Sequence, residues 1–426
     1  MSGWNVIPIK QLGRVVTGKT PPTGSQEYYG GDELFVSPKD LTRDSCFISE
    51  TETKITTRAL EKFKGQVIPK NSVMFTSLSF AFGKMGITTR PCITNQQINT
   101  VVPNAEHNYR FMYYLLRTYE SIIFSYNSGI DTPIVPKSVF EKIQVRCPDL
   151  ELQEKIAAVL SAYDDLIDKN RRRIELLERM AEELYREWFV RFRFPGYQQV
   201  SLEKGIPRGW KLVKLANAFN YTGGGTPAKE VVRYWNEGTV NWFTPSDITA
   251  SKGIFLNNSS DRCTDEGLAN SSAKIFPAYS VMMTSRATIG AIGINLTPAC
   301  TNQGFISCIP NENYPLTYLY HWLKLSKPHF ECLSTGATFP ELTKGVFKKI
   351  EILTPPKVLV GKFEDLAISF FKEIESLQRA NAELHATRSL LLTRLISGKL
   401  PVDQLDIQFP PSMREADAAR QEVAHA

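Results

Sequence analysis

Apolar side chains recur with the spacing of a coiled-coil helix in two parts of the chain. Between residues 156 and 188 they follow one another at alternating intervals of four and three residues, and the same spacing returns 207 residues later, between 363 and 395. This is the a/d seam of a helix that packs on another helix. The residues that define the predicted seam are Ile156, Leu160, Ile167, Ile174, Leu177, Leu184, Trp188, Phe363, Phe370, Ile374, Leu377, Leu384, Leu391 and Leu395.

The two seams predict two long helices, the first a rod of about 50 Å at 1.5 Å per residue. We expect them to pair with each other as an antiparallel coiled coil, because a narrow stripe suits a partner helix better than a globular surface. The alternative is that each helix lies along its own domain. Asn170, Asn381 and Arg388 stand at seam positions, where polar side chains would penalise wrong registers or meet a partner chain.

The rest of the chain mixes short β-branched and aromatic runs, such as residues 73–76, with short helical patterns, such as residues 110–119. Gly, Pro and Asn separate these segments, which indicates compact mixed domains. We therefore predict a mixed α/β (α+β) fold. The expected parts are a first globular domain (1–150), a central helix (151–190), a linker (191–206), a second globular domain (207–357), a C-terminal helix (358–397) and a tail (398–426), polar and rich in alanine from residue 412.

An internal repeat links the two halves of the chain. Its matching positions are displaced by 206 to 208 residues, too consistently for chance, and such a repeat implies one structural unit built twice. The matches include Gly18 with Gly224, Thr20 with Thr226, Pro38 with Pro245, Asp40 with Asp247, Asn95 with Asn302 and Gln96 with Gln303.

Residues 13–20, GRVVTGKT, satisfy the G-x-x-x-x-G-K-T pattern of a phosphate-binding loop. Such a loop must lead into a helix, yet Pro21 and Pro22 follow at once and disfavour helical geometry before them. In the second copy, Lys19 is replaced by Gly225. What both copies keep is Gly-x-Thr-Pro, which indicates a turn rather than a nucleotide site.

Composition and charge narrow the function further. The seven cysteines form no C-x-x-C pair and the five histidines no metal-ligand spacing, so neither a disulfide framework nor a metal site is expected. No apolar run of about eighteen residues and no leader pattern occur, so we expect a cytoplasmic protein without membrane contact. The net charge of +6 divides into +4 on residues 1–150 (17 basic, 13 acidic), +4 on 201–355 (15 and 11), and −1 on each helical part (9 and 10). A positive balance on two linked domains suits a polyanion such as double-stranded DNA.

The chain closely resembles the specificity subunits of type I restriction-modification systems. The resemblance covers nearly its whole length and rests on the two Gly-x-Thr-Pro openings, the two Thr-Asn-Gln turns, and the helix ends IELLERMAEELYREWFVRFRFPG (174–196) and LLLTRLISGKL (390–400). It implies two target recognition domains joined by two antiparallel helices, each domain reading one half of a bipartite DNA sequence.

The resemblance also implies the partners. They would be two methyltransferase subunits, which modify adenine with S-adenosylmethionine, and restriction and translocase subunits, which use ATP and Mg²⁺. The chain itself would carry no catalytic residue, metal or cofactor. A methylation-only complex stays open, and so does a coiled-coil adaptor that binds no DNA.

The repeat separates two classes of candidate DNA-binding residue. Two domains that read different half-sites should agree where they are scaffold and differ where they touch bases. Thr20, Asn95, Gln96, Thr226, Asn302 and Gln303 are shared, which favours structural turns or phosphate contacts. Three basic residues differ between the copies: Lys19, Lys84 and Arg286 have Gly225, Ala291 and Leu78 as their counterparts. Lys39 is the remaining candidate DNA-binding residue. Lysine and arginine suit guanine, and a solvated surface charge is the alternative for each.

The central helix carries four arginines that could line the DNA gap or bind a subunit, or form an exposed helix face: Arg171, Arg172, Arg173 and Arg186.

Overall fold

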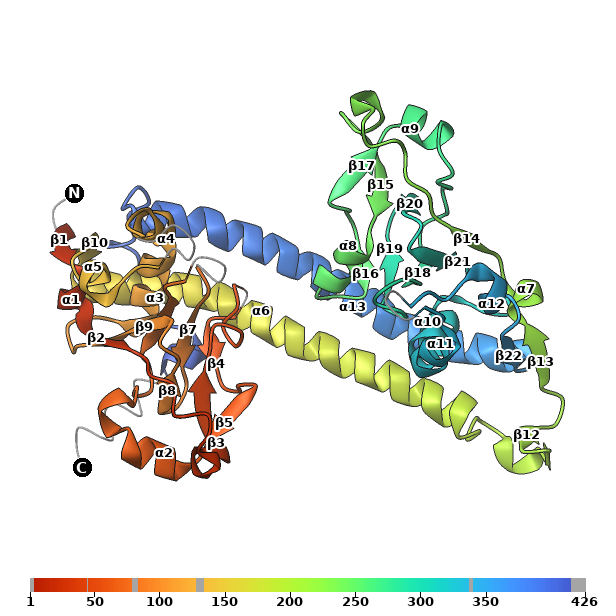
Figure 1. The fold of residues 1–426 in the computed structure, drawn as a ribbon, viewed down its shortest axis with the longest axis horizontal. Helices are drawn as coiled ribbons and strands as arrows, with labels where there is room; N and C mark the ends of the chain where they lie inside the picture. The colour runs from red at the N-terminus through yellow and green to blue at the C-terminus, as the bar shows by residue number, and fades with distance from the viewer. Residues whose placement is uncertain (1–3, 44, 79–82, 128–133, 337–339, 415–426) are drawn as a thin grey trace. The chain divides into compact units, whose positions relative to one another are not determined.

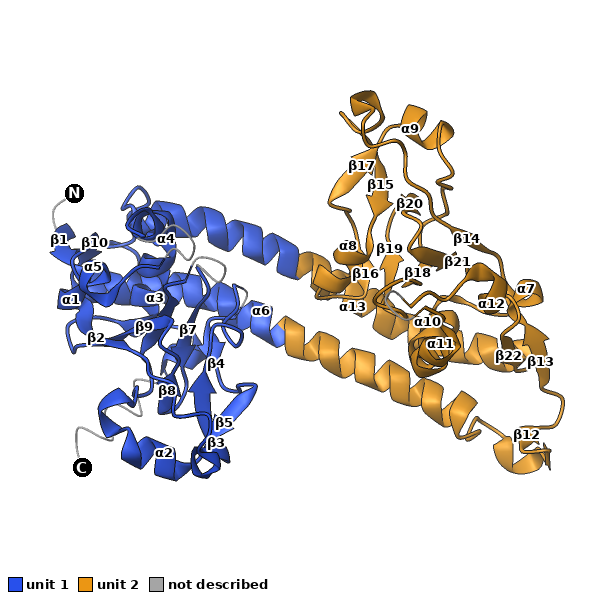
Figure 2. Cartoon of the chain, in the orientation of Figure 1, with its two compact units in different colours: residues 1–169, 381–426 blue, residues 170–380 orange. Residues whose placement is uncertain are grey.

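The protein is described from a computed structural model, which covers residues 4–43, 45–78, 83–127, 134–336 and 340–414. The chain forms two compact units, one of residues 1–169 and 381–426 and the other of residues 170–380 (Figure 2). Each unit therefore combines a globular part with segments of both long helices. The limits predicted for the two recognition domains stay a prediction, because the division between units runs through the helices rather than at their ends.

The globular part of the first unit is built on two small mixed sheets and one strand pair (Figure 1). The strands run in the order β2-β9-β6-β7-β4 in one sheet and β5-β3-β8 in the other, and β1 pairs with β10. The strands are β1 (Trp4–Pro8), β2 (Gly13–Thr17), β3 (Tyr29–Val36), β4 (Phe47–Ile48), β5 (Thr53–Ile55), β6 (Val73–Thr76), β7 (Met85–Thr88), β8 (Cys92–Thr94), β9 (Ile98–Pro103) and β10 (Gln144–Pro148). The helices are α1 (Ile9–Leu12), α2 (Thr57–Lys62), α3 (Tyr109–Thr118), α4 (Glu120–Ser125) and α5 (Lys137–Phe140).

The globular part of the second unit repeats this topology strand for strand. Its sheets have the orders β14-β21-β18-β19-β16 and β17-β15-β20, and β13 pairs with β22. The strands are β13 (Lys211–Lys214), β14 (Tyr221–Gly223), β15 (Val240–Phe243), β16 (Phe255–Leu256), β17 (Asp261–Cys263), β18 (Val281–Thr284), β19 (Ile292–Asn295), β20 (Ala299–Thr301), β21 (Phe305–Cys308) and β22 (Glu351–Thr354), with an extra pair, β11 (Leu202–Glu203) and β12 (Ile206–Pro207). The helices are α7 (Leu215–Ala218), α8 (Pro245–Ala250), α9 (Asp265–Ala269), α10 (Leu316–Leu325), α11 (Lys327–Leu333) and α12 (Lys344–Phe347). The predicted repeat and mixed α/β class are confirmed.

Local sequence explains the central elements of each copy. All four residues of β6 and of β18 are buried, as expected for β-branched and apolar runs at the centre of a sheet. Asn108 caps α3 by accepting hydrogen bonds from the backbone NH groups of Arg110 and Phe111, and Thr264 caps α9 in the same manner. The repeat therefore keeps the central strand of each larger sheet buried, and side-chain caps begin α3 and α9.

The two predicted long helices are present as α6 (Leu150–Tyr185) and α13 (Lys357–Ile396). A π-helical turn, Arg186–Val190, continues α6. Every residue of the predicted seam is buried or half-buried. Ion pairs join Asp164 to Arg388 and Arg173 to Glu373, so residue numbers rise along one helix as they fall along the other. The antiparallel coiled coil is therefore confirmed.

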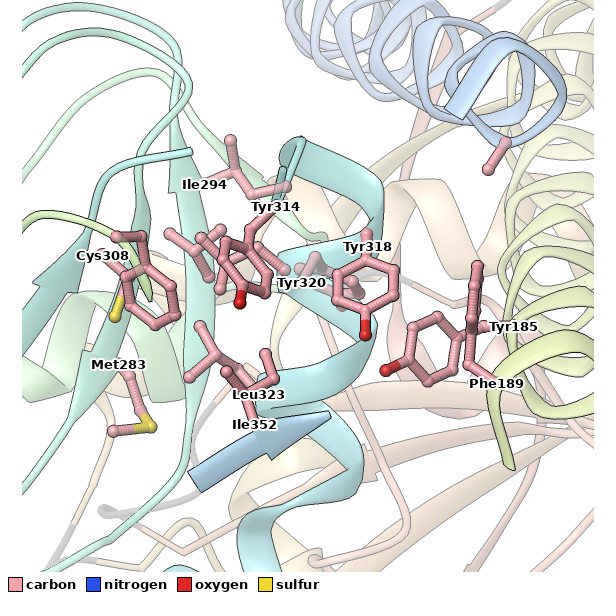
Figure 3. Close-up of a cluster of buried hydrophobic side chains, with 14 of the residues drawn as sticks. Tyr185, Phe189, Met283, Ile294, Cys308, Tyr314, Tyr318, Tyr320, Leu323 and Ile352 are labelled. Carbon is pink, nitrogen blue, oxygen red and sulfur yellow. The ribbon is translucent and has the colours of Figure 1, made fainter. Parts of the chain in front are cut away.

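The end of α6 packs into the core of the second unit through aromatic rings (Figure 3). The Phe189 ring meets that of Tyr318 edge-on, with centroids 4.8 Å apart, and meets that of Phe363 on α13 at 5.0 Å. The ring centroids of Tyr185 and Tyr318 lie 5.3 Å apart. Edge-on pairs of this kind add to the hydrophobic gain from burying the rings. The aromatic residues at the end of α6 thus join both helices to the second globular part.

The segment after α13 packs on the first unit. Val402 and Met413 are each 4% exposed. The buried Arg110 donates to the carbonyl oxygen of Ser412 at 3.0 Å, and the Lys155 ammonium donates to that of Asp403 at 2.7 Å. Residues 398–414, expected as part of a tail, therefore pack on the first unit and add Val402 and Met413 to its core, while residues 415–426 lie outside the described part of the chain.

His321 gives the second unit a pH dependence that can be measured. The ring is 1% exposed, and its Nδ1 donates to the Thr317 carbonyl oxygen at 2.6 Å. Burial lowers the pKa of His321 to about 4, against about 6.5 in an unfolded chain. Between these values the unfolded chain binds the extra proton, so the free energy of unfolding should fall as pH drops, by up to about 1.4 kcal/mol per pH unit.

The expected result is that His321→Phe removes this part of the slope between pH 6.5 and 4 in urea unfolding curves. The matched control is His329→Phe at an exposed histidine, which should leave the His321 contribution in place. Equal slopes for the wild type and His321→Phe would show that the buried ring does not titrate in this way.

Candidate nucleic-acid interface

The two Gly-x-Thr-Pro turns are held in the same way in both units. The Thr20 hydroxyl donates to Oε1 of Gln96 at 2.6 Å, and the Thr226 hydroxyl donates to Oε1 of Gln303 at 2.7 Å. Each bond joins the turn that follows the edge strand β2 or β14 to the turn that follows β8 or β20. The shared Thr and Gln, which lie far apart in sequence, thus form one structural unit at the surface.

Glycine is required in these turns because the backbones approach closely. A Cβ atom on Gly18 would lie 2.2 Å from the carbonyl oxygen of Thr94, and one on Gly224 would lie 1.9 Å from that of Asn302. Neither distance leaves room for a side chain. Residues 13–17 form strand β2, and the next helical turn begins only at Gln26. GRVVTGKT therefore lacks the loop-to-helix geometry of a phosphate-binding loop.

Other shared polar residues also bind their own backbone. Asn95 Oδ1 accepts from the Gln97 NH at 2.6 Å, and Asn302 Oδ1 accepts from the Gly304 NH at 2.9 Å. Asp247 accepts from the backbone NH groups of Thr244 and Ser260 at 2.6 and 2.9 Å. Although burial alone would raise it, hydrogen bonds from Ser260 and Thr244 hold the pKa of Asp247 below its usual value. These contacts use the shared side chains to shape turns.

The basic residues that differ between copies lie in three different settings. Lys19 and Lys39 are exposed. Lys84 is half-buried, and its ammonium donates to the Pro38 carbonyl oxygen at 3.3 Å. Arg286 has a side chain 51% exposed and pairs with Glu341 at 2.9 Å, whereas its counterpart Leu78 is 4% exposed. Lys84 and Arg286 thus contact other groups of the same chain, whereas Lys19 and Lys39 face solvent.

The sequence motifs did not single out one basic residue near the second turn, Lys229. Lys229 follows Thr226 by three residues and lines a cavity of about 700 Å³ with Trp235, Arg262 and Asp261. Its ammonium lies 5.4 Å from the ring centroid of Trp242 and 5.9 Å from that of Trp235. Its counterpart at a displacement of 206 is Thr23. Comparing the residues just beyond the shared turns would have revealed this difference.

The two indole rings hold the loop that carries Lys229. The Trp242 Nε1–H donates to the Gly225 carbonyl oxygen at 2.8 Å, and the Trp235 Nε1–H donates to that of Ala228 at 3.1 Å. A cation over an aromatic face is attracted to the ring. The same pair of tryptophans therefore holds the backbone just before Lys229 and lies beside its ammonium group.

Within the described ranges, no group of three or more His, Cys, Asp or Glu side chains could hold a metal ion. In that part of the chain, no helix is both long and apolar enough to cross a membrane.

The family described as the type I restriction modification DNA specificity domain matches residues 1–179 and 207–359. The chain is 28% identical over 416 residues to the type I restriction enzyme MjaIX specificity subunit of Methanocaldococcus jannaschii, covering 94% of each chain. It is 24% identical to the HindI specificity subunit of Haemophilus influenzae, covering 74% of this chain and 81% of that one.

Among solved structures, the type I restriction-modification S subunit from M. genitalium superposes with a TM-score of 0.58 at 15% identity, covering 92% of this chain and 96% of that one. This likeness concerns the fold. The duplicated family match extends over both globular parts and most of the first long helix. The chain therefore belongs to the family of type I restriction-modification DNA specificity proteins.

Proposed function

We propose that each globular part reads one half of a bipartite double-stranded DNA target and that the two long helices set the unread gap between the halves. The observation that supports this most strongly is the repeat itself. The two copies have the same strand order and the same Thr–Gln bond, yet they carry different basic residues at equivalent positions. A scaffold that is constant while its cations vary suits two readers of different sequences.

The shared and differing residues take different roles in this proposal. Lys19, Lys84, Arg286 and Lys229 are candidates for half-site recognition, because a cation in one copy faces a non-basic residue in the other. Lysine and arginine can donate to the O6 and N7 atoms of guanine in the major groove. The shared turns hold the loops that read the bases and provide phosphate contacts; they are formed by Thr20, Asn95 and Gln96 in the first copy and by Thr226, Asn302 and Gln303 in the second. Lys39 provides a further phosphate contact.

Catalysis belongs to other subunits in this proposal. The partners are two methyltransferase subunits, which modify adenine with S-adenosylmethionine, and restriction and translocase subunits, which need ATP and Mg²⁺. The chain would work in the cytoplasm, where the DNA is. Each globular part carries a net charge of +4, whereas each helical part carries −1. A duplex that binds the globular parts would therefore release counterions there.

The test of the proposed function is to co-express the chain with its cognate methyltransferase and to map modified adenines across a genome by single-molecule sequencing. The expected result is a bipartite motif with a fixed gap that disappears when this chain is omitted. A soluble, assembled complex that produces no chain-dependent modification would contradict the proposal.

Arg286→Ala should relax recognition in the second half-site and leave the first unchanged. Losing one bidentate contact to a base costs about 1–3 kcal/mol of discrimination, which is roughly tenfold or more in the preference for the correct base. The exposed ion pair with Glu341 contributes at most about 1 kcal/mol to stability, so folding should persist. The readout is the methylated motif.

The matched control is Glu341→Gln, which removes the ion pair but keeps the arginine, and should retain the wild-type motif. Lys229→Ala should also affect the second half-site alone. An intact first half-site shows in each case that the complex is assembled. An unchanged second half-site for both alanine variants would remove these residues as readers.

The helices can be tested as a ruler by inserting one heptad into each of them. The antiparallel pairing fixes both lengths together, so matched insertions beside residues 169–170 and 380–381 keep the two seams in register. Seven residues add about 10 Å to each helix, which corresponds to roughly three base pairs at 3.4 Å each. The methylated motif should show both half-sites unchanged and a longer gap, whereas a constant gap would show that the helices do not set it.

A further inference from the structure

We propose that the buried ion pair of Asp164 and Arg388 determines which helices pair, so that α6 joins α13 of its own chain and not a helix of the same kind from a second copy. The proposal concerns assembly of the chain and does not depend on DNA recognition.

The pair lies where three helices of the first unit meet. The Arg388 guanidinium on α13 donates through Nη1 to Oδ1 of Asp164 on α6, and the Tyr114 hydroxyl on α3 donates to Oδ2 of the same carboxylate. The two charged side chains are 12% and 6% exposed. Burial and the Asp164 carboxylate raise the pKa of Tyr114 well above its usual value, so the hydroxyl keeps its proton and donates. Both carboxylate oxygens are therefore satisfied within the fold.

The equivalent place in the second unit is apolar. The positions displaced by 207 residues are Phe371 for Asp164, Ala181 for Arg388 and His321 for Tyr114. Phe371 and Ala181 are 2% and 0% exposed and belong to one core, in which the Phe371 ring lies 5.6 Å from that of His321. Since 164 + 388 and 181 + 371 both equal 552, the antiparallel register sets each pair at corresponding positions. One end of the coiled coil thus carries a charged pair and the other end an apolar pair.

Apart from Asn170 and Asn381, the rest of the seam does not distinguish the two helices well. At the remaining seam positions both helices carry mainly apolar residues at the same intervals, because the repeat preserves the heptad register. In two copies of the chain, α6 could therefore pair with α6, and α13 with α13. A seam built only of apolar residues specifies the pairing of helices poorly, whereas one buried polar position can specify it.

Either pairing of like helices would leave a buried charge without its partner. In α6 with α6, Asp164 would face Ala181 of the second copy. In α13 with α13, Arg388 would face Phe371 of the second copy. An unpaired buried charge is strongly destabilising. Only α6 with α13 gives the carboxylate its guanidinium and sets the alanine against the phenylalanine.

A second polar contact favours the same pairing. Arg110, which is 4% exposed, donates to the carbonyl oxygen of Ser412 at 3.0 Å, and the Ser412 hydroxyl donates to Oδ2 of Asp165 on α6. Ser412 lies in the segment that follows α13, so this contact forms only when the end of α13 meets the start of α6.

The test moves the arginine from one helix to the other. In the double variant Ala181→Arg/Arg388→Ala, α6 carries both charges, so α6 with α6 and α13 with α13 are satisfied, and α6 with α13 is violated at both ends. Within one chain, pairing has the advantage of an effective concentration of about 1 mM, roughly a thousandfold over 1 µM protein. Two buried charges without partners destabilise the pairing of α6 with α13 by more than this advantage. Light scattering after size exclusion should give 48.1 kDa for the wild type and twice that mass for the double variant.

A quadruple variant distinguishes altered pairing from simple damage. Adding Asp164→Phe and Phe371→Asp to the double variant transfers the whole ion pair to the second unit and again matches α6 with α13. This variant should return to the monomer. A monomeric double variant would overturn the proposal, and so would a misfolded double variant that the two further substitutions fail to rescue, because the proposal predicts rescue.

Discussion

The antiparallel pairing of α6 with α13 is the constraint on which the rest of the structure depends. Neither globular part completes its core from its own stretch of chain. The first unit's core includes Leu395, Ile396 and Val402 from the far end of the chain, and the second unit's core includes Tyr185 and Trp188 from the central helix. Because each helix contributes apolar residues to both units, the seam is part of two cores at once, and loss of the pairing would expose both.

This arrangement explains how a duplicated chain can keep two similar parts while each reads something different. The requirements of the fold are met by turns that use their own side chains, such as Thr20 with Gln96 and Thr226 with Gln303. The side chain three residues beyond each turn threonine takes no part in this bond and differs between the copies. Lys229 opposite Thr23 is the clearest case, since the two tryptophans position a cation that the first copy lacks. Constancy of scaffold and variation of cations are therefore two consequences of one repeat.

The sequence predicted the elements that depend on periodicity and repetition. The seam, the antiparallel helices and the mixed fold follow from spacings that any chain with these residues would show. Contacts between residues far apart in sequence could not be predicted. Arg388 stands on the seam, but its partner Asp164 follows Tyr163, the seam position between Leu160 and Ile167, so a heptad count does not identify it. Residues 398–414 have no periodicity, and their place against the buried Arg110 depends on tertiary packing alone. The ion pair of Arg286 with Glu341 joins residues 55 apart, and no local pattern marks it.

The central claim is that the two globular parts are equivalent readers on one scaffold, and the most direct measurement is to replace residues 207–355 by a second copy of residues 1–150 and map the methylated motif. The account predicts a symmetric motif, with the first half-site present twice as an inverted repeat, since the helices that carry the two readers run antiparallel. A motif that keeps the original second half-site would contradict the account, because its sequence would then be read by something other than the part that was replaced.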